Sequence, residues 1–187
     1  MNKKYFHIIS QAQQILVSRP PDLAHEITHH YRVYENCLSI CATEKLKLDL
    51  ESLCIAAWWH DIIGRNVEEP IFLASLMKKD KYQNKKVETC LSLISEHSFG
   101  QTQTSVESKV LFDADKLEYV NPFRLKLFID ATKAGLIDQR LSIKYCEQWY
   151  QRVPSLVGNL HFQYSRNAFE KMLVQASHLM DKYHRSE

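Results

Sequence analysis

Glycine and proline are scarce in this chain, and the long stretches between them constrain its fold more than any other feature. Only four glycines and five prolines occur among 187 residues. The stretches between them carry apolar residues at the three- and four-residue spacing of an α-helix, and we find neither an alternating strand pattern nor an internal repeat. The sequence therefore predicts an all-α fold, a compact multi-helix bundle.

The predicted helices begin and end near these glycines and prolines. Pro20–Pro21 ends the first helix, Gly64 suits the end of the third, and Asn121–Pro122 reads as an N-cap followed by a proline in the first turn. No segment rich in Gly, Ser or Pro separates the helices, so we expect one domain over residues 1–187. In the first helix the inner stripe is predicted to contain Phe6, Ile9, Ala12, Gln13 and Leu16. The segments predicted to be helical are 3–18, 23–42, 48–63, 70–79, 85–97, 105–120, 122–135, 138–152 and 161–184.

Composition and charge argue against several classes of protein. A formal net charge of +2 is too weak to indicate nucleic acid or an anionic membrane surface as a partner. No apolar run approaches the roughly 20 residues of a membrane span, and the N-terminal segment lacks the apolar core and cleavage site of a signal peptide. The five cysteines are odd in number and form no C-x-x-C motif, so we expect buried, reduced thiols and a cytoplasmic protein.

The run IAAWWHDII, residues 55–63, places a histidine and an aspartate inside an apolar segment. A buried carboxylate without a partner is costly, so a hydrogen-bonded pair, a solvent-lined pocket or a bound cation must compensate Asp61. Asp61 shares the inner stripe with Ala57, and His60 lies about 100° around the helix from it. The two side chains can therefore meet only beside the helix, near its C-terminal end. A divalent cation explains the pair, and a metal-free His–Asp hydrogen bond is the alternative.

Two further segments place polar residues among apolar ones. His29 lies on one stripe with Val33 and Cys37; taken alone, it fits a hydrogen-bonded core histidine better than a metal ligand. In FDADKLEYV, residues 112–120, Asp113 and Asp115 point in different directions from the predicted helix. The residues on the same side of the helix as each aspartate are apolar. Periodicity does not choose between these aspartates, but it predicts a helix that is buried on more than one side and a carboxylate with an unusual partner.

Together these segments resemble the HD-domain superfamily of metal-dependent phosphohydrolases, in its small, single-domain and largely uncharacterised branch. The resemblance runs from about residue 24 to residue 120, with the helices of 122–185 completing the bundle. It is carried by H-E-x-x-H-x-x-R-V (His25, Glu26, His29, Arg32, Val33), then W-H-D-I-I, then D-A-D-K-L.

The resemblance implies one divalent metal ion, such as manganese, iron, nickel, cobalt, zinc or magnesium. The ligands carried over from the family pattern are His29, His60, Asp61 and Asp115. His29 is chosen because it stands three residues before the R-V pair, and Asp115 because a basic residue and then leucine follow it. Asp113 then becomes a structural carboxylate near Lys109 and Lys116. The residue three after Asp61 is Gly64, so no tight second acidic motif stands there, and no second histidine cluster lies beyond His97; a mononuclear centre is therefore expected.

The activity implied is hydrolysis of a phosphomonoester or pyrophosphate bond of a nucleotide or related small phosphate by metal-activated water. Asp61 acts at the reacting centre, and Glu68 and Glu69 are candidate bases, or else a solvated turn before Pro70. The candidate substrate contacts are Arg32, Lys116 and His97. For Arg32 and Lys116 the alternative is an ion-paired or surface base, and for His97 a helix C-terminal histidine.

Two other functions stay open from the sequence. One is a catalytically silent HD module that binds a nucleotide or a partner protein, and the other is an all-α structural protein without a metal. The expected partners are a small phosphorylated substrate and, if the aromatic C-terminal segment around Phe162 and Phe169 is a dimer face rather than core, a second copy of the chain. Neither a nucleic acid nor a membrane is expected.

Overall fold

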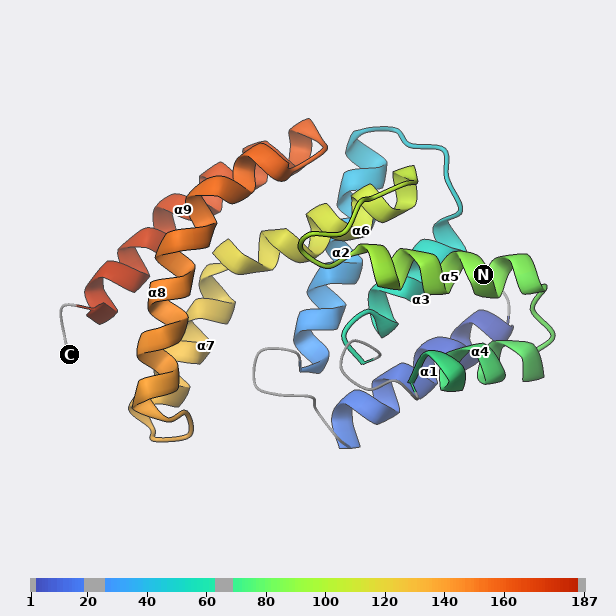
Figure 1. Ribbon diagram of the computed structural model, residues 1–187, viewed down its shortest axis with the longest axis horizontal. Coiled ribbons are helices and arrows are strands. Elements are labelled where there is room, and N and C mark those ends of the chain that lie inside the picture. Colours follow the sequence, from blue (N-terminus) through green and yellow to red (C-terminus); the bar gives the residue numbers. More distant parts are fainter. Residues whose placement is uncertain (1–2, 19–25, 63–68, 185–187) are drawn as a thin grey trace. The chain divides into compact units, whose positions relative to one another are not determined.

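A computed structural model describes residues 3–18, 26–62 and 69–184 of the chain (Figure 1). Helices, turns and short connections account for all of these residues, and no strand occurs among them, so the predicted all-α class is confirmed. The chain divides into two compact units, residues 1–115 and 116–187. The expectation that residues 1–187 form a single domain stays a prediction.

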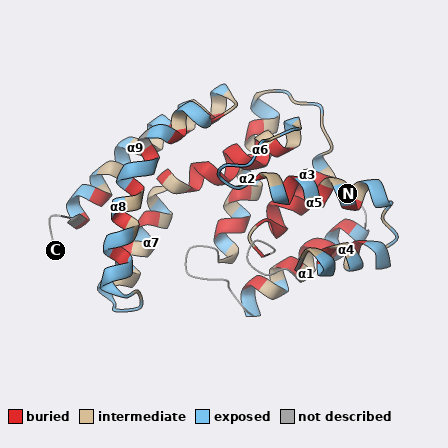
Figure 2. Ribbon diagram, viewed as in Figure 1, coloured by how far each residue is buried: buried red, intermediate tan, exposed pale blue. Residues whose placement is uncertain are grey.

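The first unit is built around one apolar helix. Its helices are α1 (Lys3–Ser18), α2 (Ile27–Thr43), α3 (Leu50–Trp59), α4 (Glu69–Lys79), α5 (Asn84–Glu96) and α6 (Val106–Lys116). Every residue of α3 from Ser52 to Trp59 is buried, and α3 packs against α1, α2 and α5 (Figure 2). A helix that is apolar all round must be covered on all sides, which explains why the WHD segment lies at the centre of the unit.

The N-terminus of α3 is held by a polar cluster at its first turn. Asp49 is the N-cap, and its carboxylate accepts hydrogen bonds from the backbone N–H of Ser52 at 3.2 Å and from the Ser52 hydroxyl at 2.7 Å. The Lys86 ammonium of α5 lies 2.6 Å from Asp49 Oδ1 and 3.2 Å from Glu51 Oε2. This cluster joins α3 to α5 at the end of α3 that lies away from His60.

The second unit has its own apolar core. It comprises the 3₁₀ turn η1 (Leu117–Val120), α7 (Pro122–Lys133), α8 (Gln139–Leu156), the 3₁₀ turn η2 (Val157–Asn159) and α9 (Gln163–His184). Asn121 caps α7 as predicted, accepting hydrogen bonds from the backbone N–H groups of Phe123 and Arg124. Phe169 of α9 is fully buried in this core. Among the described residues its largest apolar contributors include Leu117, Leu125, Trp149, Val153, Leu156, Phe169, Met180 and Tyr183.

The structure corrects three of the expectations about helices. Phe6 is 61% exposed, and Tyr5 instead lies in the core beside Ile9, Ala12 and Leu16. The third helix ends at Trp59 rather than residue 63, with His60 as its C-cap and Asp61 in the following turn.

The helix expected to stop at residue 152 continues through position 154 to Leu156. Both Val153 and Leu156 are buried, because they extend the apolar stripe of Cys146 and Trp149. Burial of these two side chains favours the extra turn, although proline disfavours a helix interior.

None of the five cysteines forms a disulfide; four are buried and Cys41 is partly buried.

None of the helices within the described ranges has the length and apolar character needed to cross a membrane.

Candidate metal centre

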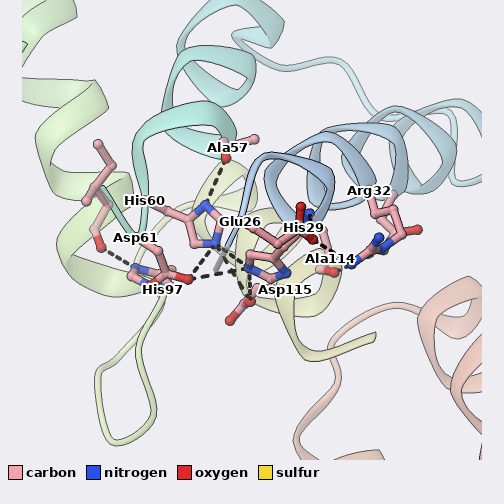
Figure 3. A network of polar contacts seen from close by, with 11 residues as sticks. Glu26, His29, Arg32, Ala57, His60, Asp61, His97, Ala114 and Asp115 are labelled. Carbon is pink, nitrogen blue, oxygen red and sulfur yellow. Dashed lines mark hydrogen bonds and ion pairs between the residues drawn. The ribbon is translucent and has the colours of Figure 1, made fainter. Parts of the chain in front are cut away.

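Four side chains from three segments of the first unit converge on one point (Figure 3). His29 comes from the first turn of α2, His60 and Asp61 from the end of α3 and the turn after it, and Asp115 from the C-terminal end of α6. One ligand atom from each residue lies within 4.8 Å of the others. This group contains the same four residues that the HD resemblance predicts as ligands.

The two imidazoles face each other through the same ring atom. His29 Nε2 lies 3.2 Å from His60 Nε2. Asp61 Oδ2 lies 3.4 Å from His29 Nε2 and 3.2 Å from His60 Nε2. Asp115 Oδ1 lies 3.6 Å and 3.8 Å from the same two nitrogens. Both carboxylates thus direct one oxygen at the pair of imidazoles.

A backbone carbonyl determines which nitrogen of His60 carries the proton. His60 Nδ1 lies 2.8 Å from the carbonyl oxygen of Ala57, and because a carbonyl can only accept, Nδ1–H must donate to it. Nε2 of the neutral ring therefore directs its lone pair toward His29, Asp61 and Asp115. A hydrogen bond of this kind, behind a ligand histidine, is typical of metal sites because it sets the tautomer and the orientation of the ring.

The carboxylates of the centre stabilise positive charge beside them. Burial lowers the pKa of His60, but the carboxylates of Asp61 and Asp115 outweigh it and raise the pKa to about 10. Burial likewise raises the pKa of Asp61, yet the facing imidazoles hold it well below its ordinary value. Two carboxylates and two buried imidazoles therefore favour a cation among them, whether a proton or a metal ion.

The spacing of the four ligand atoms fits a divalent ion. Metal–nitrogen and metal–oxygen distances of about 2.0–2.2 Å place neighbouring ligand atoms about 2.8–3.1 Å apart in octahedral and about 3.3–3.6 Å apart in tetrahedral coordination. The five separations that involve an imidazole nitrogen run from 3.2 to 3.8 Å, and all four ligand atoms lie within 4.8 Å of one another. A set of two imidazole nitrogens and two carboxylate oxygens suits manganese, iron, cobalt, nickel, zinc and, less well, magnesium.

Two more histidines lie against the four-residue group. His97, the C-cap of α5, is 6% exposed, and its Nε2 lies 3.5 Å from Asp61 Oδ1, the oxygen turned away from His29 and His60. Its Nδ1–H donates to the carbonyl of Ile94. His97 is outside the set of four ligand atoms that meet within 4.8 Å, so it contacts a predicted ligand rather than completing the set.

The other histidine is His30, which follows His29 directly in α2. Its ring is fully buried and packs against the rings of His60 and His29, with centroid distances of 4.7 and 5.4 Å. Sequence reasoning missed this contact because a stripe drawn through His29, Val33 and Cys37 assumes that one face of α2 is inside. The dipeptide His29–His30 was the available signal for a helix covered on two sides.

The predicted substrate-contacting cations differ in their surroundings. The Arg32 guanidinium lies one turn from His29 on α2; it donates to the Thr28 hydroxyl at 2.8 Å and lies 3.8 Å from the Glu26 carboxylate. Glu26 is the N-cap of α2, so this contact ties Arg32 to the helix start that carries His29. Lys116 is 3% exposed, and its ammonium lies 5.7 Å above the ring of Tyr119.

Several predicted positions fall outside the description. His25, Gly64 and Glu68 lie outside the described residues, and for Glu69 only its place as the first residue of α4 is described. Of the two aspartates in the DAD segment, Asp115 joins the four-residue group, in agreement with the HD resemblance. Asp113 is fully buried and is not a member of the group.

The structure thus shows an all-α protein with a candidate metal site, and the comparisons identify the family. The sequence model of the HD domain matches residues 27–120, just over half of the chain. The chain therefore belongs to the HD domain family, a superfamily of metal-dependent hydrolases. A comparison with curated protein sequences gives no match.

Solved structures share the fold over nearly the whole chain. A protein from Lactobacillus plantarum is 17% identical, with a TM-score of 0.78 over 100% of this chain and 97% of that chain. YpgQ from Bacillus subtilis, solved in complex with ADP, is 19% identical, with a TM-score of 0.73 over 99% and 95%. A protein described as a predicted HD superfamily hydrolase, from an uncultured Thermotogales bacterium, is 21% identical, with a TM-score of 0.60 over 98% and 91%.

Proposed function

We propose that this protein hydrolyses a phosphomonoester or pyrophosphate bond of a nucleotide or related small phosphate. The observation that carries the proposal is the convergence of His29, His60, Asp61 and Asp115 within 4.8 Å, at the spacing of a coordination shell. Phosphate esters hydrolyse very slowly without a catalyst, so electrostatic stabilisation and positioning must supply most of the acceleration. A bound divalent ion supplies both, since it neutralises phosphoryl charge and lowers the pKa of a coordinated water.

The residues of the chain hold and orient the reactants in this proposal. His29, His60, Asp61 Oδ2 and Asp115 Oδ1 would hold the metal ion, which would supply a Lewis acid for the phosphate and for water. Imidazole and carboxylate ligands together suit manganese among the ions named above, so Mn²⁺ is the ion used in the test below. Asp61 is only partly buried, unlike His29 and His60, so phosphate approaches from its side.

Arg32 and His97 are the proposed phosphate contacts, and Lys116 is a third candidate. Arg32 presents a planar donor fork one turn from His29, and His97 stands against the outer oxygen of Asp61. Glu68 and Glu69 are the proposed bases that accept the proton of the attacking water, because the HD pattern places an acidic residue shortly after its His–Asp pair.

Two arguments support a nucleotide as the proposed substrate: the ligand of a protein with the same fold, and the chemistry of the phosphate group. YpgQ, which shares the fold at 19% identity, was solved with ADP. A nucleoside phosphate offers phosphoryl oxygens to a metal centre and to Arg32 at once. We also place the protein in the cytoplasm, since five free cysteines suit a reducing compartment.

A silent HD module that binds a nucleotide or a partner protein is the second candidate. The complete four-residue group favours hydrolysis, because a binding module has no need of both buried imidazoles and both carboxylates. Retained metal without any turnover would support the silent module.

The test is hydrolysis of a panel of nucleoside mono-, di- and triphosphates and simple phosphate esters with Mn²⁺, comparing the wild type with Asp61→Ala. Asp130→Ala is the matched control, because Asp130 is an exposed aspartate paired with Lys126 in the second unit. We expect turnover on a subset of the panel that is lost in Asp61→Ala and kept in Asp130→Ala, with unchanged far-UV circular dichroism in both. Full metal content and activity in Asp61→Ala would refute the proposed centre.

A further inference from the structure

Asn36 lies on the face of α2 that also carries the predicted ligand His29. The two residues are seven positions apart, which is close to two full helical turns, so their side chains leave α2 in nearly the same direction. Asn36 is half-buried, and its Nδ2–H donates to the carbonyl oxygen of Ala114 in α6 at 3.1 Å. The contact joins two helices across 78 positions of the chain.

The acceptor of this hydrogen bond belongs to the peptide group that leads directly into Asp115. Asp115 is the second-last residue of α6, and the backbone changes to the 3₁₀ turn η1 at Leu117. The last turn of a helix lacks part of its internal hydrogen bonding, so its carbonyls are the least restrained in the element. A side chain that holds the Ala114 carbonyl therefore restrains the backbone at the place where Asp115 must be positioned.

We infer that Asn36 is a positioning residue for Asp115, setting the distance between this carboxylate and the His29 imidazole; this inference rests on the proposed metal-dependent function. His29 Nε2 and Asp115 Oδ1 lie 3.6 Å apart. His29 is part of α2, and the backbone beside Asp115 is hydrogen-bonded to α2 through Asn36. A metal ion tolerates only small errors in such a distance, so hydrogen bonds behind a ligand typically contribute 10- to 100-fold to metal affinity.

The test measures metal binding by the apo-protein rather than turnover. Asn36→Leu keeps the approximate side-chain volume and removes the donor, and Asn36→Ala is a second variant in case leucine is not accommodated. Asn159→Ala is the matched control, because Asn159 Nδ2–H also donates to a helix carbonyl, that of Ser155, at 3.2 Å but in the second unit. Mn²⁺ affinity is measured by titration calorimetry, and the absorption spectrum of bound Co²⁺ reports the coordination geometry.

We expect the Asn36 variants to weaken Mn²⁺ binding by about 10- to 100-fold and to alter the Co²⁺ spectrum, while Asn159→Ala changes neither. A role in general stability would lower the unfolding midpoint but leave the affinity of the folded protein unchanged. Unchanged Mn²⁺ affinity and an unchanged Co²⁺ spectrum in the folded variants would therefore overturn the inference. Absence of Mn²⁺ and Co²⁺ binding in the wild type would instead refute the proposed function itself.

Discussion

Replacing Asp49 by alanine should destabilise α3, the helix that leads into His60 and Asp61, without changing the candidate metal centre. Loss of the N-cap that accepts both Ser52 hydrogen bonds costs about 1 kcal/mol. The partly exposed Lys86 pair adds about 0.5 kcal/mol, and Lys86 keeps its contact with Glu51. We therefore expect the free energy of unfolding to fall by about 1–2 kcal/mol.

The effect has a defined pH dependence. Burial raises the pKa of Asp49, but the hydrogen bonds from Lys86 and Ser52 outweigh it and hold the pKa below its ordinary value. Because the folded pKa is the lower one, this stabilisation is complete above the unfolded pKa of about 3.9 and is lost as the pH falls through the folded pKa. The difference between wild type and Asp49→Ala should thus be constant between about pH 5 and 7 and shrink below about pH 4.

The assay is urea unfolding of the apo-protein, followed by circular dichroism, for Asp49→Ala, Lys86→Ala and the double variant. Lys86→Ala should cost less than Asp49→Ala, because it leaves both Ser52 hydrogen bonds in place. An equal loss of unfolding free energy in the two single variants would refute the assignment of the larger share to the cap. A difference between wild type and Asp49→Ala that persists unchanged at pH 3 would refute the pH dependence derived from the lowered pKa of Asp49. Mn²⁺ affinity should be the same in all folded variants.

Three further predictions follow from the site and the core. Removing divalent ions with a chelator should abolish phosphate hydrolysis, and added Mn²⁺ should restore it; activity that survives exhaustive chelation would contradict a metal-dependent mechanism. Arg32→Lys should raise KM for the phosphate substrate about tenfold with little change in kcat, since lysine cannot bind bidentately; an unchanged KM in steady-state kinetics would remove Arg32 from the substrate site. Phe169→Ala should lower the free energy of unfolding by about 3–5 kcal/mol, because Phe169 is fully buried; a loss below about 1 kcal/mol in urea titrations would show that the second unit repacks around the gap.

Much of the helical architecture could be predicted because its limits are set by local chemistry. Asn121 caps α7 through its own side chain, and Gly135 ends it at a positive φ of 72° that glycine adopts without strain. The errors arose where tertiary burial decides instead. Position 154 lies inside α8 because Val153 and Leu156 are both buried, and Phe6 is exposed although it matches the helical period.

The candidate site shows the same division. His60 and Asp61 could be placed beside the end of their helix from geometry, but periodicity alone did not choose between Asp113 and Asp115. That choice needed the HD resemblance, and Asp115 is the one of the two that lies in the four-residue group. The contacts of His30 and Asn36 could not be derived from the sequence, since each depends on which segment lies opposite α2.

Because the four candidate ligands come from separate parts of the chain, the centre can form only when the first unit has folded. Residue 29, the adjacent residues 60 and 61, and residue 115 lie in three segments far apart in sequence, so no fragment with only one or two of these segments can assemble the four-residue group. An ion that binds the folded unit alone stabilises it by about 2.7 kcal/mol when present at a hundredfold excess over its dissociation constant. A metal ion bound there would act as a reversible cross-link among α2, the end of α3 and α6, so the free concentration of the ion would set part of the free energy of unfolding of the first unit.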